Sequence, residues 1–96
     1  MVNLIRDAIR REKVCKFYTN ESVSVFVPVS IELSPIYGHN HIVGINSDSQ
    51  PQVIKLSQTQ KISVLENKMK ITEEMCELIG EQLEKIYEEE YNECSD

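Results

Sequence analysis

The stretch that most constrains the fold is residues 22–33, SVSVFVPVSIEL, in which a branched apolar residue occupies every odd position. Side chains of a β-strand alternate between its two faces, so this register would direct all of these residues toward one core. A helix would scatter the same residues around its circumference. We therefore predict one long strand whose inward face consists of Val23, Val25, Val27, Val29, Ile31 and Leu33.

Pro28 stands in the middle of this predicted strand. Proline has no backbone N–H group and cannot complete the hydrogen-bond ladder of a central strand. We therefore expect a bend, a bulge or an unpaired edge at this position, so that the long strand turns a corner.

The remaining elements follow from periodicity and from turn residues. Asn3 can cap a short helix that runs to about Glu12. Residues 66–70 form a charged connector that we expect to be partly helical, and Thr72 can cap a last helix with apolar residues at i, i+3 and i+4. The other predicted strands are residues 14–19, 41–45, 53–56 and 61–65.

The predicted order of elements indicates an α+β fold. Short strands joined by short loops commonly close into a small barrel, which hides their edges. We expect residues 1–66 to form a helix and a five-stranded β-barrel, and residues 67–96 to form an acidic amphipathic helix and tail. This second segment would either complete the same compact domain or form a dimer interface.

The charge of the chain is unevenly distributed. Residues 1–65 contain seven Lys/Arg and five Asp/Glu, whereas residues 66–96 contain three Lys and eleven acids. The two parts therefore carry net charges of +2 and −8. Such asymmetry indicates that the acidic part takes part in an interaction or forms a solvated surface.

The cysteines and the apolar segments bear on location. Cys15, Cys76 and Cys94 are odd in number and form no CxxC pair, so we expect reduced thiols, with Cys15 and Cys76 in the core and Cys94 in the tail. No segment has the length of an apolar membrane span, and the N-terminal residues do not form a secretory signal. We expect a cytoplasmic protein that does not bind a membrane.

The segments LIRDAIRREKVCKFY, VFVPVSIEL, GHNHIVGIN and VIKLSQTQKISVLE follow one another in a pattern that resembles the WYL domain. That domain is an SH3-like β-barrel of bacterial and phage regulators, and the YolD-like proteins share a similar helix-plus-barrel pattern. The resemblance covers roughly residues 3–66. It implies a small five-stranded SH3-like barrel and binding of nucleotides or nucleic-acid ends through aromatic and arginine side chains.

At the positions that match the family's Trp-Tyr-Leu, this chain has residues 41–43, His-Ile-Val. Where the family carries an arginine-bearing segment before its last strand, this chain has Lys55 and Lys61. The candidate ligand-binding residues of the barrel are therefore His39, His41, Lys55 and Lys61.

Catalytic and metal-binding motifs are scarce. His39 and His41 are two apart and could share one side of a strand, but no acid or cysteine is spaced to complete the three or four ligands that a metal needs. The sequence contains no nucleophile elbow, phosphate-binding loop or dinucleotide fingerprint. We therefore expect a protein that is not an enzyme and has no cofactor and no metal site.

A basic patch precedes the first predicted strand and consists of Arg6, Arg10, Arg11 and Lys13. These cations could contact phosphate groups, because each neutralised phosphate releases counterions. The acidic segment, residues 66–96, would repel a polyanion, so nucleic-acid binding is the weaker alternative. The other interpretation is that these cations face glutamates of the last helix, within the chain or across a dimer.

The last helix combines an apolar stripe with an acidic face formed by Glu77, Glu81, Glu84 and Glu88. The stripe is longer than a small barrel is wide, so its distal end should lack a partner within the chain. We predict a homodimer or partner interface there, formed by Leu83, Ile86, Tyr87 and Tyr91.

These observations predict a non-enzymatic binding or regulatory module that acts on another protein or on a nucleotide or nucleic acid. The alternative is a small acidic inhibitor of the phage type, similar to an anti-CRISPR protein, that blocks a nucleic-acid-binding enzyme. The second hypothesis belongs to a different class of function, an inhibitor rather than a regulatory or ligand-binding module.

Overall fold

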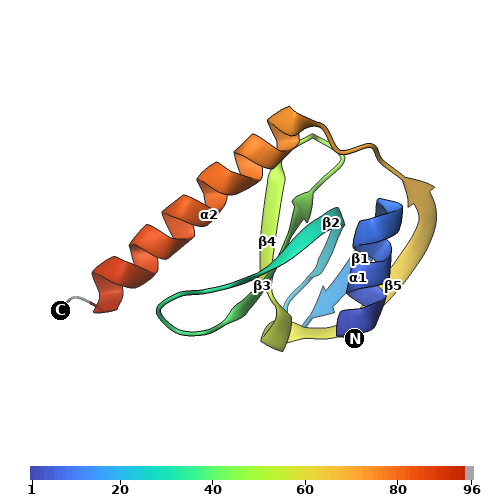
Figure 1. The fold of residues 1–96 in the computed structure, drawn as a ribbon. Helices are drawn as coiled ribbons and strands as arrows, with labels where there is room; N and C mark the ends of the chain where they lie inside the picture. Colours follow the sequence, from blue (N-terminus) through green and yellow to red (C-terminus); the bar gives the residue numbers. More distant parts are fainter. Residues whose placement is uncertain (95–96) are drawn as a thin grey trace.

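This computed structural model describes residues 1–94 of the chain, and the side chains of residues 1–93. Within this range, five antiparallel strands and two α-helices make up an α+β fold. The strands form one open sheet in the order β4-β3-β2-β1-β5 (Figure 1). In chain order the elements are α1 (Val2–Arg11), β1 (Lys13–Thr19), β2 (Val23–Leu33), β3 (Asn40–Ile45), β4 (Pro51–Lys55), the 3₁₀ turn η1 (Leu56–Gln58), β5 (Thr59–Lys68) and α2 (Glu73–Cys94).

Strand β2 belongs to both halves of the sheet. Its first part, up to Phe26, pairs with β1, and its second part, from Val27 onward, pairs with β3. The register with β3 shifts between Pro28 and Ser30. The predicted irregularity at Pro28 is therefore confirmed, and it lies close to the point where the strand changes partner.

The predicted inward face of β2 is wrong for three of its residues. Val23, Val25 and Leu33 are 52%, 45% and 62% exposed. Phe26, at an even position, is buried, and its ring stacks on that of Phe17 with 4.4 Å between centroids. The reason is that α1 covers the face that carries Phe26, so the larger aromatic side chain takes the core position.

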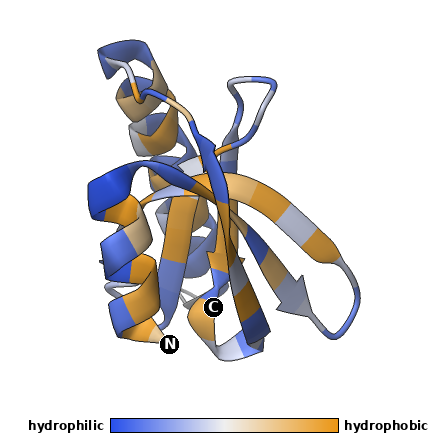
Figure 2. Ribbon diagram, turned by 90° about the vertical axis from the view of Figure 1, so that its right-hand side faces the viewer, coloured by the Kyte–Doolittle hydropathy of each residue, from blue (hydrophilic) through white to orange (hydrophobic). Residues whose placement is uncertain are grey.

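Two apolar clusters lie on opposite faces of the sheet. Ile5 of α1 packs in the first cluster with Ile42, and Ile79 of α2 packs in the second cluster with Val43. Because Ile42 and Val43 are consecutive in β3, their side chains point to opposite faces. Strand β3 is therefore covered by α1 on one side and by α2 on the other. Figure 2 shows hydrophobic residues along the strands between them.

Gly44 lets β2 and β3 approach closely beside Pro28. A Cβ atom at this position would lie 2.1 Å from the carbonyl oxygen of Val27 and 2.4 Å from Cδ2 of Phe26. Real Cβ atoms do not approach backbone atoms so closely. Position 44 therefore requires glycine for lack of space.

Two predicted boundaries differ from the structure. Helix α1 already begins at Val2, with Met1 as the capping residue and no side-chain capping bond, so Asn3 is not the cap. Strand β5 continues to Lys68, which lies opposite Lys13, so the first part of the connector is strand rather than helix. Tertiary pairing with β1 overrides the weak helical tendency of the segment.

The cysteines divide between core and surface. Cys15 is buried, as predicted, and burial raises the pKa of its thiol to about 11. Cys76 is an exposed free thiol, so its predicted core position is wrong. The side chain of Cys94 lies outside the described residues, as do residues 95 and 96 of the predicted tail. No helix within residues 1–94 is long and apolar enough to cross a membrane.

Candidate functional site

The start of α2 is fixed by two polar side chains. The backbone N–H of Met75 donates to the hydroxyl oxygen of Thr72 at 3.3 Å, which confirms the predicted cap. The carboxylate of Glu12, at the end of α1, accepts a hydrogen bond from the N–H of Ile71 at 2.9 Å. Its carbonyl oxygen accepts another from the N–H of Met69 at 3.1 Å. These bonds set the point from which α2 leaves the sheet.

The first half of α2 packs on the sheet through its apolar stripe. Ile79 is buried against Val43 and Ile45, and Met75 and Leu83 pack at the edge of the same cluster. The expectation that the stripe lacks a partner from Leu83 onward is therefore wrong for Leu83 itself. Leu83 packs against the sheet of its own chain and is not available as an interface residue.

The second half of α2 lies against the loop between β2 and β3. The hydroxyl of Ser34 donates a hydrogen bond to the carboxylate of Glu90, and both residues are buried. Ser34 also holds the loop together, because its carbonyl oxygen accepts from the N–H of Gly38 at 3.0 Å and its N–H donates to the carbonyl oxygen of His39 at 2.8 Å. Sequence reasoning missed Glu90, since it is one of three consecutive glutamates and only tertiary structure selects it for burial.

A groove of about 460 Å³, here called the distal groove, opens between this loop and α2. Tyr91 is 64% exposed at the groove, whereas Tyr87 is half-buried. Burial, followed by the nearby carboxylates of Glu32 and Glu90, raises the pKa of the Tyr87 phenol, which favours its neutral form. The residues that line the distal groove include Pro35, Ile36, Glu84, Tyr87, Glu88 and Tyr91.

The predicted interface residues are thus partly brought together. Tyr87 and Tyr91 line the distal groove, whereas Ile86 lies on another side of α2, facing His41 and Lys55. All four residues of the predicted acidic face are exposed, and two of them, Glu84 and Glu88, line the distal groove. Glu77 and Glu81 lie closer to the start of the helix and outside the groove.

A second cavity of about 330 Å³, here called the polar pocket, lies across the helix from the distal groove. Three of the four candidate ligand-binding residues, His39, His41 and Lys55, line it together. The fourth, Lys61, lies elsewhere, on β5, with its Nζ atom 5.6 Å from the ring centroid of Tyr18. On the α2 side the polar pocket is lined by Glu89, Glu90 and Glu93.

His41 is the most buried residue of the polar pocket, at 3% exposure. Burial lowers the pKa of His41 from its usual 6.5, the charges of Lys55 and His39 act in the same direction, and Glu90 opposes them. The Nδ1 atom of His41 makes no hydrogen bond to the described residues that would stabilise the charged form. Among the described residues, no three His, Cys, Asp or Glu side chains are arranged to hold a metal ion.

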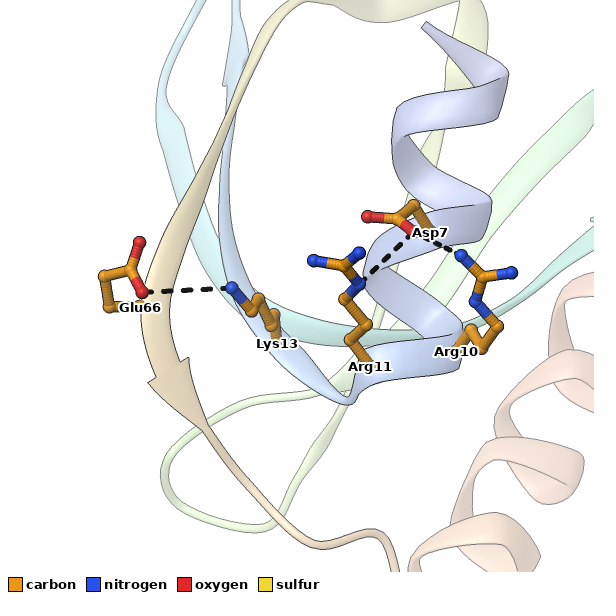
Figure 3. A network of polar contacts seen from close by, with 5 residues as sticks. All are labelled: Asp7, Arg10, Arg11, Lys13 and Glu66. Atoms are coloured by element: carbon orange, nitrogen blue, oxygen red, sulfur yellow. Dashed lines mark hydrogen bonds and ion pairs between the residues drawn. The ribbon is translucent and has the colours of Figure 1, made fainter.

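Three of the four cations of the basic patch, Arg10, Arg11 and Lys13, have acidic partners close by rather than on α2. Asp7 forms ion pairs with Arg10 at 2.6 Å and with Arg11 at 3.4 Å, and Lys13 lies 3.9 Å from Glu66 of β5 (Figure 3). The hydrophilic last turn of α1 is blue in Figure 2. Within the described residues, the expected pairing of these cations with glutamates of α2 in the same chain is therefore wrong.

No protein-family model, curated protein or solved structure matches this chain. What bears on function is therefore the geometry of α2 and its surroundings. That geometry brings an exposed tyrosine and two carboxylates together beside an apolar loop, and it separates them from the polar pocket by the width of the helix.

Proposed function

We propose that this chain is a non-enzymatic binding module whose distal groove takes a basic partner surface with an apolar anchor. The observation that carries the proposal is the exposure of Tyr91 in a groove that also contains Glu84 and Glu88. Exposed apolar surface rimmed by charge is typical of an interaction site. Aromatic side chains in such sites contribute much of the binding energy, and the rim charges provide specificity and faster association.

The charge distribution supports a basic rather than an acidic partner. The segment from residue 66 to residue 96 carries a net charge of −8, and no lysine or arginine is among the residues that line the distal groove. The field of such a segment attracts cations and repels nucleic acid. A nucleic-acid-binding enzyme also presents a basic surface, so the inhibitor hypothesis is the same proposal with a specified partner.

Nucleotide binding in the polar pocket is the weaker proposal. His39, His41 and Lys55 would suit a phosphate group, but the carboxylates of Glu89 and Glu93 line the same pocket. These negative charges within the same pocket oppose the binding of an anion. The pocket is therefore better explained as the polar part of the contact between α2 and the sheet.

We also propose that the bent sheet is an SH3-like barrel of the WYL or YolD type, and that the protein is cytoplasmic. The pairing of β1 with β5 brings the first and last strands of the chain side by side, and β2 pairs with β1 in its first part and with β3 in its second, a bent arrangement that supports a small barrel. The free thiols of Cys15 and Cys76 support a reducing location.

The proposal is tested with a fluorescein-labelled peptide of alternating lysine and leucine and with a second peptide in which serine replaces leucine. We expect fluorescence anisotropy to detect binding of the first peptide, weaker binding of the second, and weaker binding of both at high salt. Glu84→Lys/Glu88→Lys should weaken binding about tenfold or more, which corresponds to about 1.4 kcal/mol.

The matched control is Glu77→Lys/Glu81→Lys, which changes the net charge equally outside the distal groove. This variant should lose much less affinity. Equal losses in both variants would mean that the peptide responds only to the overall charge of α2, and the proposed groove would then have no specific role.

A further inference from the structure

One face of the sheet is left uncovered where β5, β1 and the start of β2 lie side by side. In this region Lys16 lies opposite Val25 and Ser63, and Tyr18 lies opposite Val23 and Lys61. Directly opposed residues of antiparallel strands share a face. The neighbours of Lys16 and Tyr18 in β1, Cys15 and Phe17, point the other way into the cluster under α1. The open sheet face therefore consists of Lys16, Tyr18, Val23, Val25, Lys61 and Ser63.

The chemistry of the open sheet face is basic and apolar. Val23 and Val25 are each about half exposed, and none of its residues is acidic. In the part of the chain that the structure describes, neither Lys16 nor Lys61 has an ion-pair partner. The ammonium group of Lys61 instead lies over the ring of Tyr18. Exposed valines between unpaired lysines are the kind of surface that the distal groove is proposed to bind.

We infer that the open sheet face of one chain docks on the distal groove of a second copy of the same chain. This inference rests on the proposed function and names the partner of the groove. Lys16 and Lys61 would face the carboxylates of Glu84 and Glu88, and Val23 and Val25 would contact the rings of Tyr87 and Tyr91. The basic groups of one surface thus meet the acidic groups of the other, and its apolar side chains meet aromatic ones.

The contact requires a second chain because the two surfaces lie at opposite ends of one molecule. The sheet order places β1 and β5 at one end, and α2 packs on β3 and β4 at the other end. A two-fold axis would use each surface once in each chain and leave neither exposed. The arginines of α1 are less suited to this role, since Arg10 and Arg11 already share Asp7.

The test is sedimentation equilibrium over a wide range of protein concentrations. The wild type should be a dimer, whereas Lys16→Glu/Lys61→Glu and Glu84→Lys/Glu88→Lys should each raise the dissociation constant about tenfold or more. An equimolar mixture of these two variants should dimerise again, because each contact then joins opposite charges. All four positions are exposed or half-exposed, and circular dichroism with denaturant titration verifies that both variants fold.

The control Arg6→Glu/Arg10→Glu changes the same number of charges on α1 and should remain a dimer. A wild-type monomer at the highest concentration, or variants that do not associate when mixed, would overturn the inference. So would dissociation caused by the α1 variant alone, or a monomer whose open sheet face binds labelled single-stranded DNA. If the lysine-leucine peptide still binds the groove in any of these cases, only the self-docking fails and the proposed function stands.

Discussion

Ser34 and Glu90 are 56 positions apart in the sequence, and their buried hydrogen bond joins the loop between β2 and β3 to the second half of α2. The bond lies between the distal groove and the polar pocket, since Glu90 lines the pocket and the residues after Ser34 line the groove. A carboxylate buried in an acidic helix is costly unless a donor satisfies it. Ser34 provides that donor and so holds the Glu90 side of α2 against the loop.

Ser34→Ala should therefore destabilise the protein by about 1–3 kcal/mol, because it leaves a buried carboxylate without its donor. The free energy of unfolding from urea titration measures the effect. Ser57→Ala, at an exposed position of the 3₁₀ turn, is the control and should stay within about 0.5 kcal/mol of the wild type. Equal stability of the two variants would mean that the Ser34–Glu90 bond contributes nothing to the docking of α2.

The two faces of β2 give a second prediction. Phe26→Ala should cost about 3–5 kcal/mol, because it removes a buried ring and its stacking on Phe17. Val25→Ala, one position earlier and half exposed, should cost much less. Guanidinium titration of both variants measures this difference. A larger loss of stability for Val25→Ala than for Phe26→Ala would contradict this structure and support the single inward face that the valine alternation predicts.

Several features of the fold could be predicted because they depend on local chemistry. The irregularity at Pro28 follows from the missing N–H group, and the start of α2 follows from the Thr72 cap and the acidic residues after it. The approximate positions of the strands follow from their alternating patterns.

The orientation of β2 could not be predicted, because it depends on contacts between distant segments. Alternation favours the valines over Phe26, and only the cover provided by α1 reverses that choice. The candidate site could be predicted only in part, for the same reason. The tyrosines and glutamates of α2 are visible in the sequence, but the burial of Glu90 and the contribution of Pro35 and Ile36 depend on where the loop docks.

The two glycines Gly44 and Gly80 give opposite expectations for the same substitution. Gly44→Ala would place a Cβ atom against backbone atoms of Val27, so it should destabilise the protein by several kcal/mol or prevent folding. Gly80 lies in the interior of α2, where an added Cβ atom would meet nothing within 4 Å. Gly80→Ala should therefore raise stability by about 1 kcal/mol. Thermal unfolding of both variants compares them, and a stabilised Gly44→Ala would contradict the packing described for β2 and β3.

His41 predicts a dependence of stability on pH. Its pKa is lowered in the folded state, so the unfolded chain binds a proton more readily as the pH falls below about 6.5. The stability contributed by neutral His41 is therefore fully present above that pH and decreases as the pH falls toward the lowered pKa of the folded state. Urea titrations at pH 7.5 and pH 5.5 should show a smaller difference for His41→Gln than for the wild type. If the loss of stability between pH 7.5 and pH 5.5 is the same in His41→Gln and in the wild type, the burial of His41 would be contradicted.

The most direct test of the proposed binding surface is a map of the amide signals that shift when the lysine-leucine peptide is added to ¹⁵N-labelled protein. We expect the affected residues to be those of the loop, including Ile36, and those of the second half of α2, including Glu84, Glu88 and Tyr91. The amides of α1 should be unaffected. Shifts confined to other surfaces, or none at peptide concentrations that saturate anisotropy, would contradict the assignment of the distal groove as the binding site.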